Sequence, residues 1–223
     1  IEKYGIFNRG KLTLTDSKGN GKLIFTKGNN GVFSNYNVMS IKGGELINLV
    51  NSIDDQYDYR RCIWTSAGSI TLISGGKFTS KGQTVCTNGK LTIDGGDFKC
   101  SGNSSVISNY AKTDTLTING GTFMNNSKTY EGGDYRRAVW TDYETATHIT
   151  EGQFTSDYQV LTFNGNAIID GATIEGNGAG CLSNGNVVIN DCKLKARTPL
   201  YVFNNNSLKC YGGIYSQKVG DEF

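Results

Sequence analysis

The sequence predicts an all-β fold, a parallel β-helix in which short strands stack coil upon coil as a solenoid. Three observations predict it. A pattern of about twenty residues recurs along the chain. Glycine is abundant and proline nearly absent, with 30 glycines and one proline in 223 residues. No stretch shows the periodicity of an amphipathic helix. A chain made almost entirely of strand ladders would exclude proline, because proline cannot donate a ladder hydrogen bond.

The clearest copies of the repeat are apolar runs that reach Gly-Gly and resume at phenylalanine. Residues 91–98 read LTIDGGDF, and residues 116–123 read LTINGGTF. A fixed period of this length is typical of stacked structural units. Weaker copies, and a degenerate one at residues 12–17, bring the expectation to about nine coils of 20 to 32 residues. The positions equivalent to Gly96 are Gly44, Gly76, Gly121, Gly152, Ala172, Cys192 and Gly213.

Stacked coils predict ladders of like side chains that point inward. One predicted ladder consists of Leu14, Ile41, Ile73, Ile93, Ile118, Ile149, Ile169, Ile189 and Cys210. A second consists of Leu46, Phe78, Phe98, Phe123, Phe154, Ile174, Leu194 and Tyr215. A third slot is expected to end a strand in each coil, because asparagine tolerates the left-handed backbone region. That slot is assigned to Asn8, Asn35, Thr65, Asn88, Asn109, Thr141, Asn164, Asn184 and Asn204.

With these ladders, the chain resembles the right-handed, pectin-lyase-like parallel β-helices over about residues 5 to 216. The likeness is one of architecture, without a family signature, and it implies right-handed coils. No linker interrupts the repeat, so residues 1–223 are expected to form a single domain, as a segment of or partner in a larger assembly. Exposed coil ends present unpaired strand edges. A capping domain or a second subunit is therefore expected, with a homotrimer along the long axis left open.

Composition limits the classes of partner. The chain has 22 basic and 20 acidic residues, a net charge of +2, whereas nucleic-acid binding would favour a basic stripe. A nucleic-acid partner is therefore not expected. No membrane-spanning run occurs, so membrane insertion is not expected either. Five of the six cysteines fall in apolar slots, and free, buried cysteines are expected. Without a Cys-x-x-Cys pair or a Cys/His cluster, we expect no metal and no cofactor.

Two coils are longer than the rest, and their insertions are related in sequence. Residues 57–65 read YDYRRCIWT, and residues 133–141 read GDYRRAVWT. The offset corresponds to three coils, so stacking would place both loops on one flank about 14 Å apart. These loops hold both tryptophans of the chain. The candidate binding residues are Asp58, Tyr59, Arg60, Arg61, Trp64, Asp134, Tyr135, Arg136, Arg137 and Trp140.

Two interpretations of the paired loops stay open. Aromatic rings with arginines and carboxylates can stack on sugar faces and bind hydroxyl or acidic groups, which favours a two-loop site for a glycan or a surface partner. Alternatively, the loops are the product of a three-coil duplication, held by tryptophan packing and local Asp–Arg pairs.

The function favoured by the sequence is non-enzymatic recognition, adhesion and spacing by a β-helix displayed on a virion or on a cell surface. In this the chain resembles the β-helices of phage fibres and tailspikes or of bacterial adhesins, which implies a glycan or host-surface ligand. Free thiols suit a virion protein made in host cytosol, and a bacterial surface protein also fits.

The alternative function is a polysaccharide lyase or glycosidase on the same fold. Its weak catalytic candidates are Glu151, Asp170 and Asp191, which are expected in adjacent slots of neighbouring coils. A pair of carboxylates facing one substrate is what a glycosidase needs, but a solvated turn edge would present the same residues. His148 is expected to be a surface residue in an outward slot and not a general base.

Overall fold

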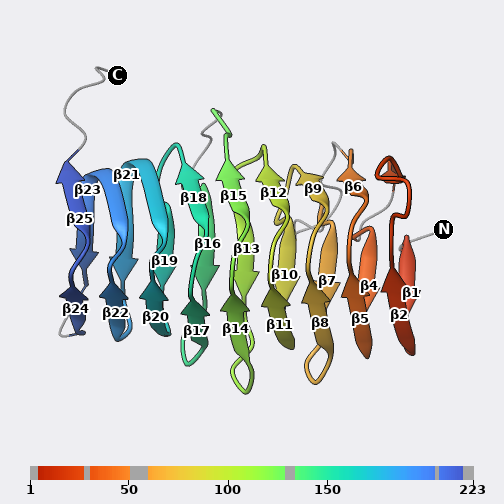
Figure 1. The fold of residues 1–223 in the computed structure, drawn as a ribbon, viewed down its shortest axis with the longest axis horizontal. Coiled ribbons are helices and arrows are strands. Elements are labelled where there is room, and N and C mark those ends of the chain that lie inside the picture. The colour runs from red at the N-terminus through yellow and green to blue at the C-terminus, as the bar shows by residue number, and fades with distance from the viewer. Residues whose placement is uncertain (1–4, 28–30, 51–59, 129–133, 204–205, 218–223) are drawn as a thin grey trace.

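The structure, a computed structural model, describes residues 5–27, 31–50, 60–128, 134–203 and 206–217. These residues form 25 strands and no helix, so none of them contributes a helix long and apolar enough to cross a membrane. Every strand pair is parallel, and most strands pair with the strand three places further along the chain. In Figure 1 the strands stand side by side in rows that follow the long axis of the molecule.

The smaller of the two sheets has nine strands, and each strand opens one repeat of the sequence. Within these strands the side chains alternate between buried and less buried positions, as they must where only one face meets the core. The strands are β2 (Lys11–Leu14), β5 (Val38–Ile41), β8 (Ile70–Ile73), β11 (Lys90–Ile93), β14 (Thr115–Ile118), β17 (Ala146–Ile149), β20 (Asn166–Asp170), β22 (Val187–Asn190) and β24 (Leu208–Tyr211).

The larger sheet has sixteen strands in two arms. One arm contains β3 (Lys22–Phe25), β6 (Glu45–Asn48), β9 (Lys77–Ser80), β12 (Asp97–Cys100), β15 (Thr122–Asn125), β18 (Gln153–Ser156) and β25 (Ile214–Gln217). The other contains β1 (Ile6–Asn8), β4 (Phe33–Asn35), β7 (Ile63–Thr65), β10 (Val85–Thr87), β13 (Ser105–Asn109), β16 (Arg137–Thr141) and β19 (Leu161–Phe163). Two long strands, β21 (Thr173–Ser183) and β23 (Lys193–Val202), join the arms.

The register confirms both predicted apolar ladders at every step. The first runs through the nine-stranded sheet from Leu14 to Cys210. The second runs along the first arm from Leu46 to Tyr215. The side chains in the middle of both ladders are fully buried. The core therefore lies between the sheets and extends along the axis.

Phenylalanine forms the most regular part of the core. Phe78, Phe98, Phe123 and Phe154 stack as near-parallel rings, with centroid separations of 4.5, 5.0 and 4.8 Å and interplanar angles of 4, 5 and 6°. The residue two positions before each of these rings is a glycine, and it needs to be one for two reasons. Gly96 has φ +117°, and a Cβ on it would approach the carbonyl oxygen of Gly76 on the preceding coil to 3.0 Å.

The predicted asparagine slot is wrong by one residue in the coils of Asn88, Asn164 and Asn184. The register positions belong to Thr87, Phe163 and Ser183. The asparagines lie just past their strands, where the amide can turn back to the preceding coil, and Asn164 Nδ2 donates to the Thr141 carbonyl at 2.8 Å. Within the true slot, Asn8 Nδ2 donates to Asn35 Oδ1 at 2.8 Å. Asn204 lies outside the described residues.

All six cysteines are free, and five of them are buried. The exception is Cys210, which had been expected in the core. It is exposed because β24 is the last strand of its sheet and nothing among the described residues stacks beyond it. Together these features describe an all-β protein of long parallel sheets without a closed barrel, consistent with a parallel β-helix or solenoid.

Candidate functional site

The two related loops return to the same arm of the larger sheet. One leads into β7 and the other into β16, with β10 and β13 between them. Three strand steps place the two segments about 14 Å apart. Asp58 and Tyr59 lie outside the described residues. The other eight candidate binding residues are described, and they lie on or beside the start of these two strands.

Both segments contain the same β-bulge, which the sequence pattern does not reveal. The backbone amides of Cys62 and Ile63 both donate to the Thr84 carbonyl, at 3.0 and 3.1 Å. Ala138 and Val139 repeat this on the Val160 carbonyl, at 2.9 and 3.1 Å. A bulge inserts one residue into the strand and redirects the side chains around it. The arginine before each bulge is thereby brought to the face that carries the tryptophan.

Each tryptophan forms an aromatic pair with a tyrosine from the preceding strand. Trp64 lies 5.1 Å from Tyr36 at 57°, and Trp140 lies 5.0 Å from Tyr110 at 56°. Both tryptophans are half-buried. The tyrosines were not among the candidates, although the shared tripeptide Ser-Asn-Tyr at residues 34–36 and 108–110 could have identified them.

Small neighbours let the tryptophan rings lie along the sheet. On both strands next to each tryptophan, the same register position holds a buried small residue: Ser34 and Cys86 beside Trp64, and Ser108 and Thr162 beside Trp140. Phe7 extends the series, since its ring lies 4.5 Å from that of Tyr36. We call the resulting row the aromatic stripe, and it consists of Phe7, Tyr36, Trp64, Tyr110 and Trp140.

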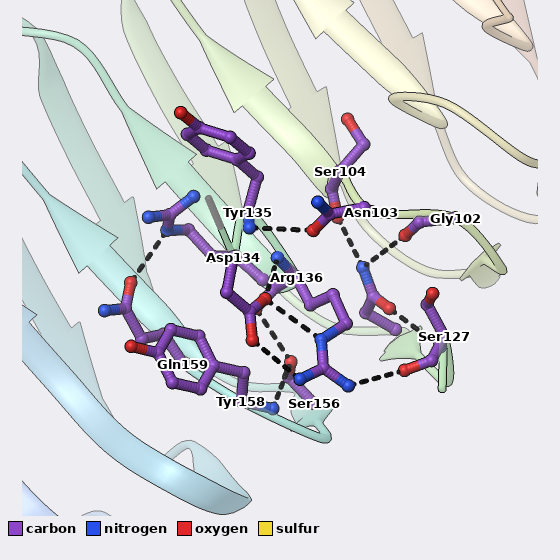
Figure 2. A network of polar contacts seen from close by, with 12 residues as sticks. Gly102, Asn103, Ser104, Ser127, Asp134, Tyr135, Arg136, Ser156, Tyr158 and Gln159 are labelled. Atoms are coloured by element: carbon purple, nitrogen blue, oxygen red, sulfur yellow. Dashed lines mark hydrogen bonds and ion pairs between the residues drawn. The ribbon is translucent and has the colours of Figure 1, made fainter. Parts of the chain in front are cut away.

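Arg136 is held in place by a network inside its own loop. Its Nε and Nη2 donate to the two carboxylate oxygens of Asp134 at 2.9 and 2.6 Å, and Nη1 donates to the Ser127 carbonyl at 2.8 Å. Figure 2 shows the guanidinium lying between Asp134 and Ser127. The two side chains of the ion pair are only 14% and 9% exposed. These bonds to Asp134 raise the pKa of Arg136, so the pair stays charged and acts as a brace for the loop.

Arg137 has a different environment, although it is the next residue. Its Nε donates to Gln159 Oε1 at 2.9 Å and to Thr162 Oγ1 at 3.1 Å. Thr162 is the register partner of Trp140, which places the guanidinium stem beside that ring. The exposed Tyr135 ring lies 5.6 Å from the Arg137 guanidinium carbon. Burial lowers the pKa of Arg137, and the charge of Asp134 only partly opposes this.

The segment around Trp64 has the same bulge and the same aromatic pair, and it is linked to the segment around Trp140. Arg61 has its backbone carbonyl occupied by Val32 N at 3.1 Å and Asn48 Nδ2 at 2.8 Å. Its charge acts on Cys86, whose pKa is raised by burial and only partly lowered by Arg61. Gln83 Nε2 donates to the Tyr110 hydroxyl at 3.2 Å, which links the coil after Trp64 to the second aromatic pair.

The acidic candidates lie on the opposite corner of the coils. Glu151, Asp170 and Asp191 line one open groove of about 640 Å³ along the Gly-Gly turns. Asp170 accepts from Asn190 Nδ2 at 2.6 Å and lies 2.9 Å from His148 Nε2. The bond from Asn190, and then that from His148, lowers the pKa of Asp170. His148 is 43% exposed, and its pairing with Asp170 was not foreseen.

The chemistry available to each region differs. The stripe offers aromatic faces, guanidinium groups and amides on one rigid sheet, which suits stacking and hydrogen bonding to a ligand. The groove offers carboxylates, and the described residues hold no group of three or more His, Cys, Asp or Glu that could bind a metal. Comparisons with protein-family models, curated proteins and solved structures found no match.

Proposed function

We propose that this chain is a right-handed parallel β-helix of about nine coils that serves as a recognition and spacing module on a virion or cell surface. It binds a glycan or another host-surface ligand, without catalysis, through the aromatic stripe. The observation that carries the proposal is the repeated Tyr–Trp pair, which has the same separation and tilt in two coils three strands apart.

The repeated Tyr–Trp geometry lies on an outer face of the sheet, which favours a role in binding over a role in core packing. A half-buried tryptophan braced by a tyrosine keeps one aromatic face available while its rotamer is fixed by the pair, so little entropy is lost when a ligand docks. Aromatic and apolar groups gathered on a surface mark interaction sites. Two such pairs about 14 Å apart on a rigid ladder can engage one extended ligand together, which strengthens binding without new contacts.

A glycan-array screen tests the proposal on the full chain. Wild type is compared with Trp64→Leu/Trp140→Leu and with a control, Tyr143→Leu, whose exposed ring lies outside the stripe. We expect wild type and the control to bind the same glycans. The double variant should lose about five- to a hundred-fold in affinity, because each of the two lost stacking contacts is worth about 0.5–1.5 kcal/mol. An array without any wild-type signal, or a double variant that binds like wild type, contradicts the proposal.

A second candidate, polysaccharide cleavage, is favoured by the groove that Glu151, Asp170 and Asp191 share. Its weak point is Asp170, because a general acid needs a raised pKa and hydrogen bonds from Asn190 and His148 lower this one. The remaining acid–base pair would be Glu151 and Asp191. Release of new reducing ends from a polysaccharide panel by wild type, abolished in Glu151→Gln, would support cleavage. Turnover that survives Glu151→Gln and Asp191→Asn would exclude these two residues as its acid–base pair.

A further inference from the structure

The paired arginines of the second loop are divided between two tasks. Arg136 and Asp134 neutralise each other in a bidentate pair. Both carboxylate oxygens of Asp134 are used in this pair, and Oδ1 accepts a further hydrogen bond from the backbone amide of Arg136 at 3.1 Å. No described carboxylate forms an ion pair with Arg137. The positive charge of Arg137 is therefore not paired in a salt bridge within the described residues, although the charge of Asp134 still acts on it.

The free end of Arg137 faces solvent. Both of its hydrogen bonds within the described residues use Nε, so Nη1 and Nη2 keep their donors. Neither terminal nitrogen is among the buried polar atoms that lack a partner, which means that water or a ligand can reach them. Gln159 and Thr162 fix the stem, and the guanidinium carbon lies 5.6 Å from the centre of the Tyr135 ring. The group is thus preorganised, and its partial burial lowers the energy that would be spent on removing water from it.

We propose that Arg137 anchors an anionic group, a carboxylate or a sulfate, carried by a sugar ring that stacks on the face of Trp140. The inference rests on the proposed function and narrows its ligand to acidic glycans. A guanidinium matches the two oxygens of a carboxylate or sulfate with two parallel N–H donors, which Nη1 and Nη2 can supply. Arg61, which precedes the matching bulge beside Trp64, is the corresponding residue of the first patch.

An acidic glycan fits the surroundings better than an acidic peptide. A peptide that binds by strand addition would need an exposed sheet edge, and β16 is an inner strand bonded on both sides, to β13 and β19. The neighbours that remain for a ligand are the rings of Tyr135 and Trp140 and the polar side chain of Gln159. Rings and amides of this kind suit the faces and hydroxyls of sugars.

The test uses the full chain and paired ligands. Isothermal titration compares alginate oligosaccharides with their carboxyl-reduced form, and heparin fragments with a form that is desulfated, N-acetylated and carboxyl-reduced, so that both counterparts are neutral. The variants are Arg137→Gln, Arg137→Lys and Lys90→Gln. The last removes one positive charge from the exposed start of β11 on the other sheet and so serves as a control for net charge. Thermal unfolding of each variant verifies that the fold is intact.

We expect wild type to prefer at least one acidic ligand over its neutral counterpart. Arg137→Gln should lower the affinity for that acidic ligand by about ten- to a hundred-fold, the range expected for loss of a hydrogen bond to a charged group. The same substitution should leave the affinity for the neutral counterpart unchanged, so that the variant no longer prefers the acidic form. Arg137→Lys should restore part of the preference, because it keeps the charge but loses the bidentate geometry. Lys90→Gln should follow wild type.

Several outcomes overturn the inference, and they separate it from the proposed function. Wild-type binding of neutral and acidic forms with equal affinity removes the anion anchor and leaves glycan recognition standing. Binding of no glycan removes both. If wild type binds inorganic sulfate as tightly as the acidic glycan, the site recognises a free anion and not an anionic group carried by a sugar. Arg137-dependent binding of polyglutamate without glycan binding would assign the site to acidic peptides and contradict the proposal.

Discussion

The phenylalanine ladder gives the sharpest test of how the fold is stabilised. Phe98 is 1% exposed and lies between two parallel rings, those of Phe78 and Phe123. Phe154 is equally buried but has one ring neighbour, because its other register partner is Ile174. We therefore expect Phe98→Ala to destabilise the protein more than Phe154→Ala, although both remove the same side chain from the same ladder.

The magnitudes follow from burial and from the number of ring contacts. Replacing a buried phenylalanine by alanine costs about 3–5 kcal/mol, and for a chain of this size that lowers the melting temperature by roughly 6–20 °C. An aromatic pair contributes about 0.5–1.5 kcal/mol beyond the buried area. Since Phe98 loses two pairs and Phe154 loses one, the two melting temperatures should differ by roughly 1–6 °C.

Intrinsic fluorescence of Trp64 and Trp140 reports unfolding in both variants, with far-ultraviolet circular dichroism as a second probe. Phe98→Leu and Phe154→Leu serve as companions, because leucine keeps most of the volume and removes the ring. The same order should hold in that pair, with smaller losses. If Phe154→Ala proves as destabilising as Phe98→Ala, or more so, ring stacking does not contribute to the ladder and burial alone accounts for its stability.

Three further predictions concern particular side chains. Asp134→Ala should destabilise the protein by about 3–5 kcal/mol, because it leaves the largely buried Arg136 charge unpaired; in chemical denaturation, Asp134→Ala/Arg136→Ala should lose less than the sum of the single variants, and strict additivity would contradict the brace. The pKa of Asp170 is lowered in the folded state from its ordinary value of 3.8. Its stabilising contribution is therefore present above pH 3.8 and is lost as the pH falls through the lower folded pKa, so Asp170→Asn should reduce the loss of stability on acidification, and an unchanged pH profile would refute the assignment. In the native protein a thiol reagent should label Cys210 first, since the other five thiols are buried and burial raises the pKa of Cys62 to about 12; mass spectrometry that finds Cys62 modified as fast would show that its coil opens.

The ladders could be predicted from the sequence because each coil repeats the same physical requirement. An inward position at a fixed distance from the Gly-Gly corner must be apolar, and Ile93 and Phe98 meet it in nearly identical surroundings. The asparagine slot was predicted less well. Asparagine can hold its coil from inside the strand, as Asn35 does, or from the residue after it, as Asn164 does. Spacing alone does not separate the two positions.

The tyrosines of the stripe were missed for a related reason. Each tryptophan rests on a ring from the preceding coil, and Tyr110 lies thirty residues before Trp140 in the sequence. A motif search confined to the inserted loops cannot find such a partner. The β-bulge could not be predicted either, because the extra residue that it inserts into a strand is not marked by any particular residue type. It is the bulge that brings Arg137 to the face of Trp140 and so assembles the site.

The two interpretations of the paired loops give different roles to residues of the same quartet. A duplication held by local Asp–Arg pairs describes Asp134 and Arg136, whose charges and hydrogen bonds are spent on each other. In the function that we propose, recognition of a ligand falls to Arg137, whose terminal donors water can reach. Bracing and binding are linked, because a loop fixed by one arginine can present the next in a single orientation. A loss of the brace should therefore weaken ligand binding as well as stability, whereas a loss of Arg137 should weaken binding alone.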